Sequence, residues 1–435
     1  MHPYKDMRTD YDEQKKIGVK RADSVSEYLA NDSPYLSDDS EAPAVPALAY
    51  TANLRHYENF EYDSDFEIAN EIAPLEDLVP QNLLVSLETR ERKRLEVVYE
   101  LLHTERTHVR NLKVLYRLFY LRFVEYSILP SNVLNLMFPN LELVLEIHRP
   151  IGHRYIRYLS LLAKKCFFCG EAGERLKNIA STFCQHLQQA LEALKQEIRK
   201  DQKLRDFLQV IETLPVCRKL QLRDMLPVEM QRLTKYPLLL ESILKYTPDP
   251  SVEADQLRKS IHGTHAILEA VNTAKRNSEN RMRLEQLQRN IDTSQFAKVN
   301  HPIRLNVTDY SLIYEGNLFW RLGKNKVVPL HAVLLDELLL LLSKSSDGHR
   351  LSLRFHNLNT GKEDMKWTHC PLLKLSNLIA KDMATDKKAF FLVSTSPYGP
   401  QIYELAASSF VEKKRLSNNL LIHPLVGHFE VYLQI

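Results

Sequence analysis

Apolar residues recur at three- and four-residue spacing from about residue 91 to about residue 295, and this spacing predicts helices. Prolines, glycines and asparagines interrupt the pattern at short intervals, near residues 129–132, 150–152, 170–173, 214–215 and 247–251. Helices joined by such short breaks bury their apolar stripes against one another. We therefore expect an elongated, all-α bundle of about six helices.

The pattern changes after about residue 300, where short runs rich in β-branched, leucine and aromatic residues alternate with turn residues. These strand-like runs cover residues 312–322, 327–342, 350–354, 388–394 and 401–405. A helical segment, about 407–422, closes the region. The order predicts a small β-barrel or sandwich capped by a C-terminal helix, so the fold class is multidomain, α and then α+β.

The first 77 residues are polar and acidic and show no sustained period, which predicts a disordered N-terminal region. We place the helical domain at 78–295 and the strand-rich domain at 296–423. A short tail, 424–435, follows.

Composition narrows the functional classes. The chain has 435 residues and a net charge of +3, which is too small for a general nucleic-acid binder. It has no phosphate-binding loop motif and no apolar run of membrane-spanning length. Its five cysteines include the pair Cys166 and Cys169, but no second pair completes a zinc set. We expect reduced thiols, no metal site and no cofactor.

Glu105 lies near the centre of the apolar stripe of a helix that covers 94–116. A carboxylate in such a place is costly to bury unless it is paired. Two interpretations remain open on the pattern alone. Either a cation inside the fold pairs with Glu105, or the stripe opens onto a groove that another protein fills.

A second informative helix covers residues 226–245 and combines an apolar stripe with a polar, basic edge. We place Gln231, Arg232 and Lys235 on that edge. Pro237 lies inside the pattern, so we expect the helix to be kinked or braced there. Taken alone, Lys235 is an ordinary surface lysine.

The string Gln-Arg-Leu-Thr-Lys-Tyr-Pro-Leu-Leu-Leu, residues 231–240, closely resembles the third conserved region of Dbl-homology domains. Thr104 and Glu105 resemble the first conserved region. Further strings across about 78–415 are similar to the RGS-containing Rho exchange factors, in which a Dbl-homology domain precedes a pleckstrin-homology domain. The resemblance therefore implies this tandem of domains.

The resemblance implies a guanine-nucleotide exchange factor that activates a Rho-family GTPase, with RhoA as the main candidate. Nucleotide exchange of this kind involves no covalent chemistry. It implies that Glu105 contacts switch I, that Lys235 and Asn272 reach switch II, and that Lys245 selects RhoA. Gln231 and Arg232 are assigned to the same GTPase-contacting surface. The subfamily links G-protein-coupled receptors to Rho, which implies a heterotrimeric G-protein α subunit as a partner through regions outside this chain.

In the pleckstrin-homology domain, the resemblance assigns Phe391 and Val393 to a patch that binds activated GTPase. Arg321, Lys324 and Lys326 are candidate contacts for an anionic phospholipid membrane. We therefore expect a cytoplasmic protein that is recruited to the plasma membrane. The alternative is a catalytically silent scaffold that binds membrane or GTPase through the pleckstrin-homology domain.

The resemblance has two departures. The final helix carries Leu416 where pleckstrin-homology domains usually have a buried tryptophan. The tail, 424–435, does not resemble the subfamily.

Overall fold

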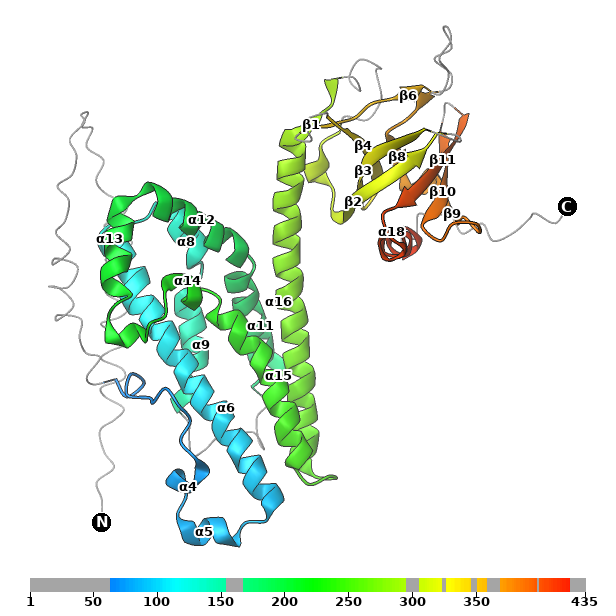
Figure 1. Cartoon of the computed structure of the whole chain (residues 1–435). Coiled ribbons are helices and arrows are strands. Elements are labelled where there is room, and N and C mark those ends of the chain that lie inside the picture. Colours follow the sequence, from blue (N-terminus) through cyan, green and yellow to red (C-terminus); the bar gives the residue numbers. More distant parts are fainter. Residues whose placement is uncertain are drawn as a thin grey trace, which may run out of the picture. The chain divides into compact units, whose positions relative to one another are not determined.

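The structure is a computed structural model that describes residues 63–153, 167–294, 305–322, 326–345, 350–357, 368–396 and 399–422 (Figure 1). Helices occupy the described chain up to Asn290, and a strand-rich domain with a final helix follows. The expected fold class is therefore confirmed. The tail and the assigned boundary at 295 lie outside the described residues.

The helical domain contains more segments than the six that the sequence pattern predicts. Its helices are α4 (Leu75–Leu78), α5 (Gln81–Ser86), α6 (Thr89–Val114), α7 (Leu121–Glu125), α8 (Ser131–Met137), α9 (Leu141–His153), α11 (Gly170–Cys184), α12 (Leu187–Lys200), α13 (Gln202–Ile211), α14 (Leu222–Met225), α15 (Val228–Tyr246) and α16 (Val252–Asn290). One reason is a π-helical stretch, Leu115–Tyr120, which separates α6 from α7 within a single run of apolar spacing.

Helix α6 is central because α15 and α9 both pack against it, while α16 packs on α15 and α11. Its inward residues, such as Val109 and Leu112, have no exposed surface. Helix α15 continues through Pro237, whose ring is buried. The helix is thus continuous across the proline, and whether it is kinked or braced there stays a prediction.

The segment before the bundle differs from the expected disorder. Residues 63–77 lie against the helical domain, and the Lys113 ammonium on α6 contacts the carboxylates of Asp63 at 2.7 Å and Asp65 at 2.5 Å. Acidic residues that suggest a solvated linker are here the partners of a buried lysine. Residues 1–62 lie outside the described part of the chain.

The strand-rich domain is built mainly from antiparallel pairs. Its strands are β2 (Leu312–Arg321), β3 (Val327–Leu335), β4 (Leu338–Lys344), β5 (Leu351–Ser352), β6 (His356–Asn357), β7 (Thr368–His369), β8 (Leu372–Lys374), β9 (Leu378–Asp382), β10 (Ala389–Ser396) and β11 (Gly399–Ala407). The main sheet has the order β1-β5-β4-β3-β2-β11-β10-β9, with β8 paired to β4 and the short β1 (Ile291–Asp292) at one edge.

Helix α18 (Phe410–Ile422) closes the core of this domain. Leu416 and Leu420 on α18 are fully buried with the inward residues of β2 and β10, such as Trp320 and Phe390. A leucine thus fills the position at which a tryptophan is usual.

The cysteines only partly follow the expectation of reduced thiols. Cys184, Cys217 and Cys370 are free and buried. Cys169 is disulfide-bonded, so the expected reduced state does not hold for it. Cys166 lies outside the described residues. Among the described helices, none is both long and apolar enough to cross a membrane.

Candidate functional site

One face of α15 is exposed along its whole length. The exposed residues recur at helical spacing and are Gln231, Thr234, Lys235, Leu238, Glu241 and Lys245. Leu238 keeps 59% of its surface exposed in the middle of this face. We call these six residues the α15 stripe. It contains three of the residues that the sequence assigns to GTPase contact.

Asn272 lies on the neighbouring helix at about the same level as Lys235. Helices α15 and α16 run antiparallel (Figure 1), and the Glu241 carboxylate contacts His265 Nε2 across them at 3.3 Å. Lys235 precedes Glu241 by six residues and Asn272 follows His265 by seven, which places both about 10 Å from that contact. Asn272 is also exposed. The hairpin thus brings the two predicted switch II contacts level with each other.

Glu105, by contrast, is inside the fold. Its side chain has no exposed surface, and its carboxylate accepts hydrogen bonds from Arg232 Nε at 2.6 Å and the Tyr236 hydroxyl at 2.7 Å. His148 Nδ1 lies 2.9 Å from the other carboxylate oxygen. The paired carboxylate, one of the two interpretations left open, is what the structure shows. Contact with switch I stays a prediction, and it requires the side chain to leave or act through this network.

Arg232 does not lie on the exposed basic edge, so its predicted placement is wrong. Only 4% of the residue is exposed, and its guanidinium donates to Thr104 Oγ1 at 2.8 Å and to the Leu101 carbonyl at 3.1 Å. One step along a helix turns a side chain by about 100°. That step carries Arg232 from the face of Gln231 to the face that meets α6, where Glu105 requires a cation.

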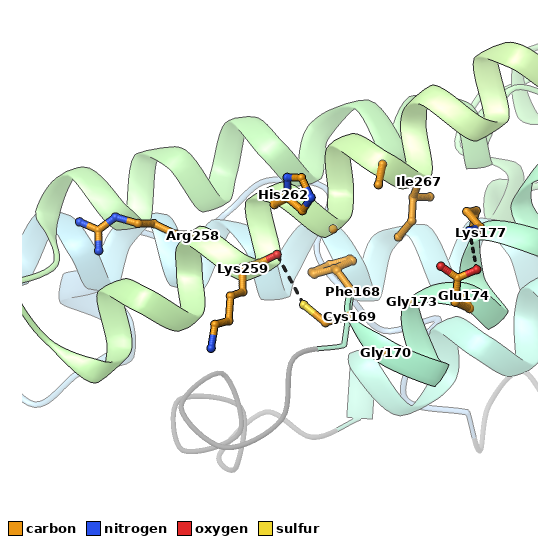
Figure 2. Close-up of a pocket in the computed structure, with 12 residues that line it drawn as sticks. Phe168, Cys169, Gly170, Gly173, Glu174, Lys177, Arg258, Lys259, His262 and Ile267 are labelled. Carbon is orange, nitrogen blue, oxygen red and sulfur yellow. Dashed lines mark hydrogen bonds and ion pairs between the residues drawn. The ribbon is translucent and has the colours of Figure 1, made fainter.

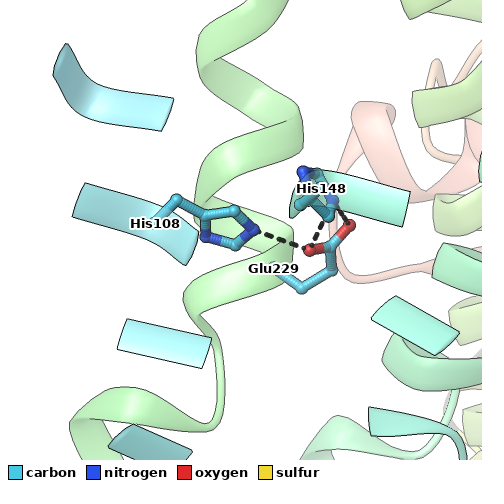
Figure 3. Close-up of side chains that lie close together, drawn as sticks. All are labelled: His108, His148 and Glu229. Carbon is cyan, nitrogen blue, oxygen red and sulfur yellow. Dashed lines mark hydrogen bonds and ion pairs between the residues drawn. The ribbon is translucent and has the colours of Figure 1, made fainter. Parts of the chain in front are cut away.

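Sequence analysis missed the rest of this network. Glu229 on α15 is buried, and its carboxylate lies 3.0 Å from His108 Nε2 and 3.2 Å from His148 Nε2 (Figure 3). His108 stands three residues after Glu105 on the same face of α6, which was an available signal. No spacing rule connects α9, which carries His148, to either helix.

The network is ionised at neutral pH. Burial by itself raises the pKa of Glu105, but Arg232 and His148 hold that pKa well below its ordinary range. Burial also opposes the charge of His148, yet Glu229 and Glu105 raise the pKa of its ring to about 10. Burial lowers the pKa of His108, and the charge of His148 lowers it further. His148 is therefore cationic and His108 neutral.

His108, His148 and Glu229 form the group among the described residues that best matches a metal-ligand set. One ligand atom from each lies within 4.8 Å of the other two. Both imidazole Nε2 atoms, however, lie within hydrogen-bonding distance of the Glu229 carboxylate, and an ionised carboxylate can only accept from them. The three potential ligand atoms are thus already hydrogen-bonded to one another, and a metal ion would have to displace the protons between them.

The predicted patch on the strand-rich domain lies on the outer face of β10. Phe391 and Val393 are half-buried, and Phe391 pairs with Glu404 of β11 while Val393 pairs with Ile402. Ile402 keeps 58% of its surface exposed beside Val393, and sequence analysis missed it. Side chains alternate between the two faces of β11, and residues directly opposite one another on paired strands share a face. This alternation was the signal that could have identified Ile402.

The candidate lipid contacts are less basic than their sequence suggests. Arg321 contacts the carboxylates of Asp386 at 2.6 Å and Glu404 at 3.3 Å. Lys326 is exposed, and Lys324 lies outside the described residues. A guanidinium shared between two carboxylates adds little net positive charge for an anionic membrane.

A pocket of about 600 Å³ lies between the start of α11 and the N-terminal half of α16 (Figure 2). Its floor includes Phe168, whose carbonyl lies so close to Gly173 and Gly263 that a methyl group at either glycine would collide with it. None of the assigned site residues lines this pocket. It is therefore separate from the α15 stripe.

Comparisons with known proteins agree on one family. The RhoGEF domain matches residues 97–272 and the PH domain matches residues 297–420. The crystal structure of PDZ-RhoGEF DH/PH domains in complex with GTPγS-activated RhoA superposes with a TM-score of 0.74 at 37% identity, covering 80% of this chain and 98% of that one. The chain belongs to the DH/PH family of Rho guanine nucleotide exchange factors.

Other relatives support the same assignment. The DH/PH domains of p115-RhoGEF superpose with a TM-score of 0.69 at 37% identity, covering 81% of this chain and 99% of that one. Rho guanine nucleotide exchange factor 12 of Mus musculus is 38% identical over 387 residues, which are 84% of this chain and 24% of that protein. The human Rho guanine nucleotide exchange factor 1 is 39% identical, with 78% and 38% coverage.

This chain spans about a quarter of the length of Rho guanine nucleotide exchange factor 12. The matched part is the DH domain, with the α15 stripe and the buried network, followed by the PH domain. The remaining parts of the longer relatives have no counterpart in the match.

Proposed function

We propose that this chain accelerates GDP release from a Rho-family GTPase, with RhoA as the first substrate to test. The observation that carries the proposal is the α15 stripe, which exposes Gln231, Lys235 and Lys245 beside Asn272 in a DH domain. A related DH/PH structure at 37% identity was solved with RhoA. The stripe residues are exposed and therefore accessible to another protein.

The proposed mechanism is preferential binding without covalent chemistry or a cofactor of this chain. A factor that binds the nucleotide-free GTPase more tightly than the GDP-bound form shifts the population toward release. A thousandfold acceleration requires about 4 kcal/mol of preferential stabilisation of the transition state. We assign that energy to Lys235 and Asn272 acting on switch II and to Glu105 acting on switch I.

The test is release of fluorescent GDP from RhoA and from two other Rho-family GTPases. Lys235→Ala removes a charged contact worth roughly 1.5–3 kcal/mol, so we expect a loss of about 10- to 150-fold in rate. Lys195→Ala is the matched control, because Lys195 is an exposed lysine on α12 away from the stripe. Tight binding without acceleration on any GTPase would instead favour the scaffold alternative.

We further propose that the PH domain docks activated GTPase through Phe391, Val393 and Ile402, and that the protein is cytoplasmic and recruited to the plasma membrane. The apolar outer face of β10 and β11 supports the docking proposal.

Regulation by a G-protein α subunit is proposed for regions outside this chain. Imaging of the tagged chain before and after receptor stimulation tests the location.

A further inference from the structure

The Glu105 carboxylate is linked to a second buried carboxylate, Glu229, by one imidazole ring. His148 on α9 contacts Glu105 through Nδ1 at 2.9 Å and Glu229 through Nε2 at 3.2 Å. All three side chains are at most 1% exposed. We propose that His148 is a positioning residue for nucleotide exchange, a buried cation that holds the Glu105 carboxylate ionised and oriented. This inference rests on the proposed exchange function.

The hydrogen-bond inventory assigns the protons. An ionised carboxylate only accepts hydrogen bonds, so every ring nitrogen that contacts one must carry a proton. Both nitrogens of His148 contact carboxylates, and Nδ1 also lies 3.2 Å from the Tyr236 hydroxyl, so with both carboxylates ionised the ring is an imidazolium. His108 contacts Glu229 through Nε2 alone, and its buried Nδ1 has no partner among the described residues. His108 is therefore the neutral tautomer with its proton on Nε2.

The charges of the network then balance. Glu105 and Glu229 carry one negative charge each, while Arg232 and His148 carry one positive charge each. Tyr236 on α15 donates to Glu105 as a neutral hydroxyl, because burial and the Glu105 charge raise its pKa. On the side of α11, burial and Glu229 raise the pKa of Cys184, which stays a neutral thiol.

Loss of the His148 charge would leave two buried carboxylates with a single cation. A net negative charge in a buried core is costly, so one carboxylate must take up a proton or turn toward solvent. Either change alters Glu105, the residue proposed to act on switch I. Removal of the Glu229 charge at the same time would restore neutrality. The pair His148→Gln and Glu229→Gln therefore separates a charge effect from a packing effect.

A metal ion in place of the proton is the competing explanation for the convergence of His108, His148 and Glu229 (Figure 3). The network is neutral and its three converging donors are hydrogen-bonded without an ion. A structural zinc site needs a fourth protein ligand, and a three-ligand catalytic site needs an open position, whereas all three of these side chains are buried. The observations thus favour the proton, and metal binding is an outcome of the test.

The experiment measures GDP release from RhoA between pH 6 and 8.5, normalised to the unassisted rate at each pH. The full chain is compared with His148→Gln, Glu229→Gln and the double variant. We expect an acceleration that varies little with pH for the full chain and falls at least tenfold at pH 7.5 for His148→Gln. The His148→Gln rate should depend on pH, because a buried carboxylate then titrates in this range. The double variant should recover most of the loss.

A His148→Gln variant that is folded and within twofold of the full chain would overturn the inference. So would a double variant no faster than His148→Gln, which would indicate a packing role. A stoichiometric metal ion, with a chelator lowering the melting temperature, would also overturn it. If the full chain itself shows no acceleration, it is the proposed function that fails.

A second measurement does not depend on exchange activity. Histidine labelled with ¹³C at Cε1 reports ring charge by NMR, and the His148 signal is identified by its loss in the double variant. We expect His148 to remain cationic at pH 8.5. A neutral ring at pH 7.5 would overturn the inference even if His148→Gln does not fold.

Discussion

The two faces of α15 carry similar residue types in opposite environments. The inner face holds Glu229, Arg232 and Tyr236, each buried and each hydrogen-bonded to another helix. The outer face holds Gln231 and Lys235, both exposed. A charge on the inner face is committed to partners within the fold, whereas a charge on the outer face is available to another protein. Inner substitutions should therefore change stability, and change exchange only through Glu105, whereas outer substitutions should change exchange alone.

The largest expected effect comes from Arg232→Ala. It leaves the Glu105 carboxylate buried without its main cation, which lowers the free energy of unfolding by about 3–5 kcal/mol. Gln231→Ala, one residue away on the outer face, should change it by less than about 0.5 kcal/mol. Urea denaturation measures both. Equal effects of the two substitutions would remove the distinction between the faces.

The next largest effect is a dependence of stability on pH, caused by the buried network that the inner face of α15 contacts. His148 binds its proton more tightly in the folded protein, where its pKa is about 10, than in the unfolded chain, where it is about 6.5. Its contribution is complete below about pH 6.5 and is lost as the pH rises toward about 10. Urea denaturation across this range should show a steeper decline for the full chain than for the double variant His148→Gln/Glu229→Gln. An equally steep fall of the unfolding free energy in the two proteins would contradict this prediction.

Ile402→Asp tests the PH domain as a second outward-facing surface. A charge placed in the middle of an apolar contact should weaken binding to GTPγS-loaded RhoA by roughly 1–3 kcal/mol, or about 5- to 150-fold. Val411→Asp on α18 is the control, since Val411 is similarly exposed outside the patch. Calorimetry with activated RhoA measures the difference. Equal losses in both variants would argue against a localised patch.

A smaller effect is expected for Leu238→Ser. Leu238 is largely exposed in the free protein, so its loss should leave the unfolding free energy nearly unchanged. In a complex it would lose about 1 kcal/mol of apolar burial, or about fivefold in affinity for nucleotide-free RhoA. Surface plasmon resonance measures this change. Unchanged affinity would mean that the α15 stripe binds through its polar residues alone.

The smallest effect is expected for Arg321→Gln. Its guanidinium already contacts Asp386 and Glu404, and half-exposed pairs of this kind contribute at most about 1 kcal/mol. Sedimentation with vesicles containing anionic phospholipid should change by less than twofold. A large loss of binding would show that Arg321 leaves its carboxylates for the membrane.

The sequence by itself determined the order of the two domains and the outward position of Lys235. Local periodicity carries this information, because an exposed stripe recurs on one helix and a strand face alternates along one strand. The same local information predicted that Glu105 required either a partner cation or a groove. It did not choose between them.

Only the tertiary structure decided which residues met Glu105. Arg232 and His148 come from two other helices, and no spacing along the chain relates α9 to α15. The docking of Asp63 and Asp65 was likewise decided by a lysine on α6 rather than by the composition of their own segment. Burial makes a charge depend on its neighbours in space, and those neighbours are set by the packing of whole helices.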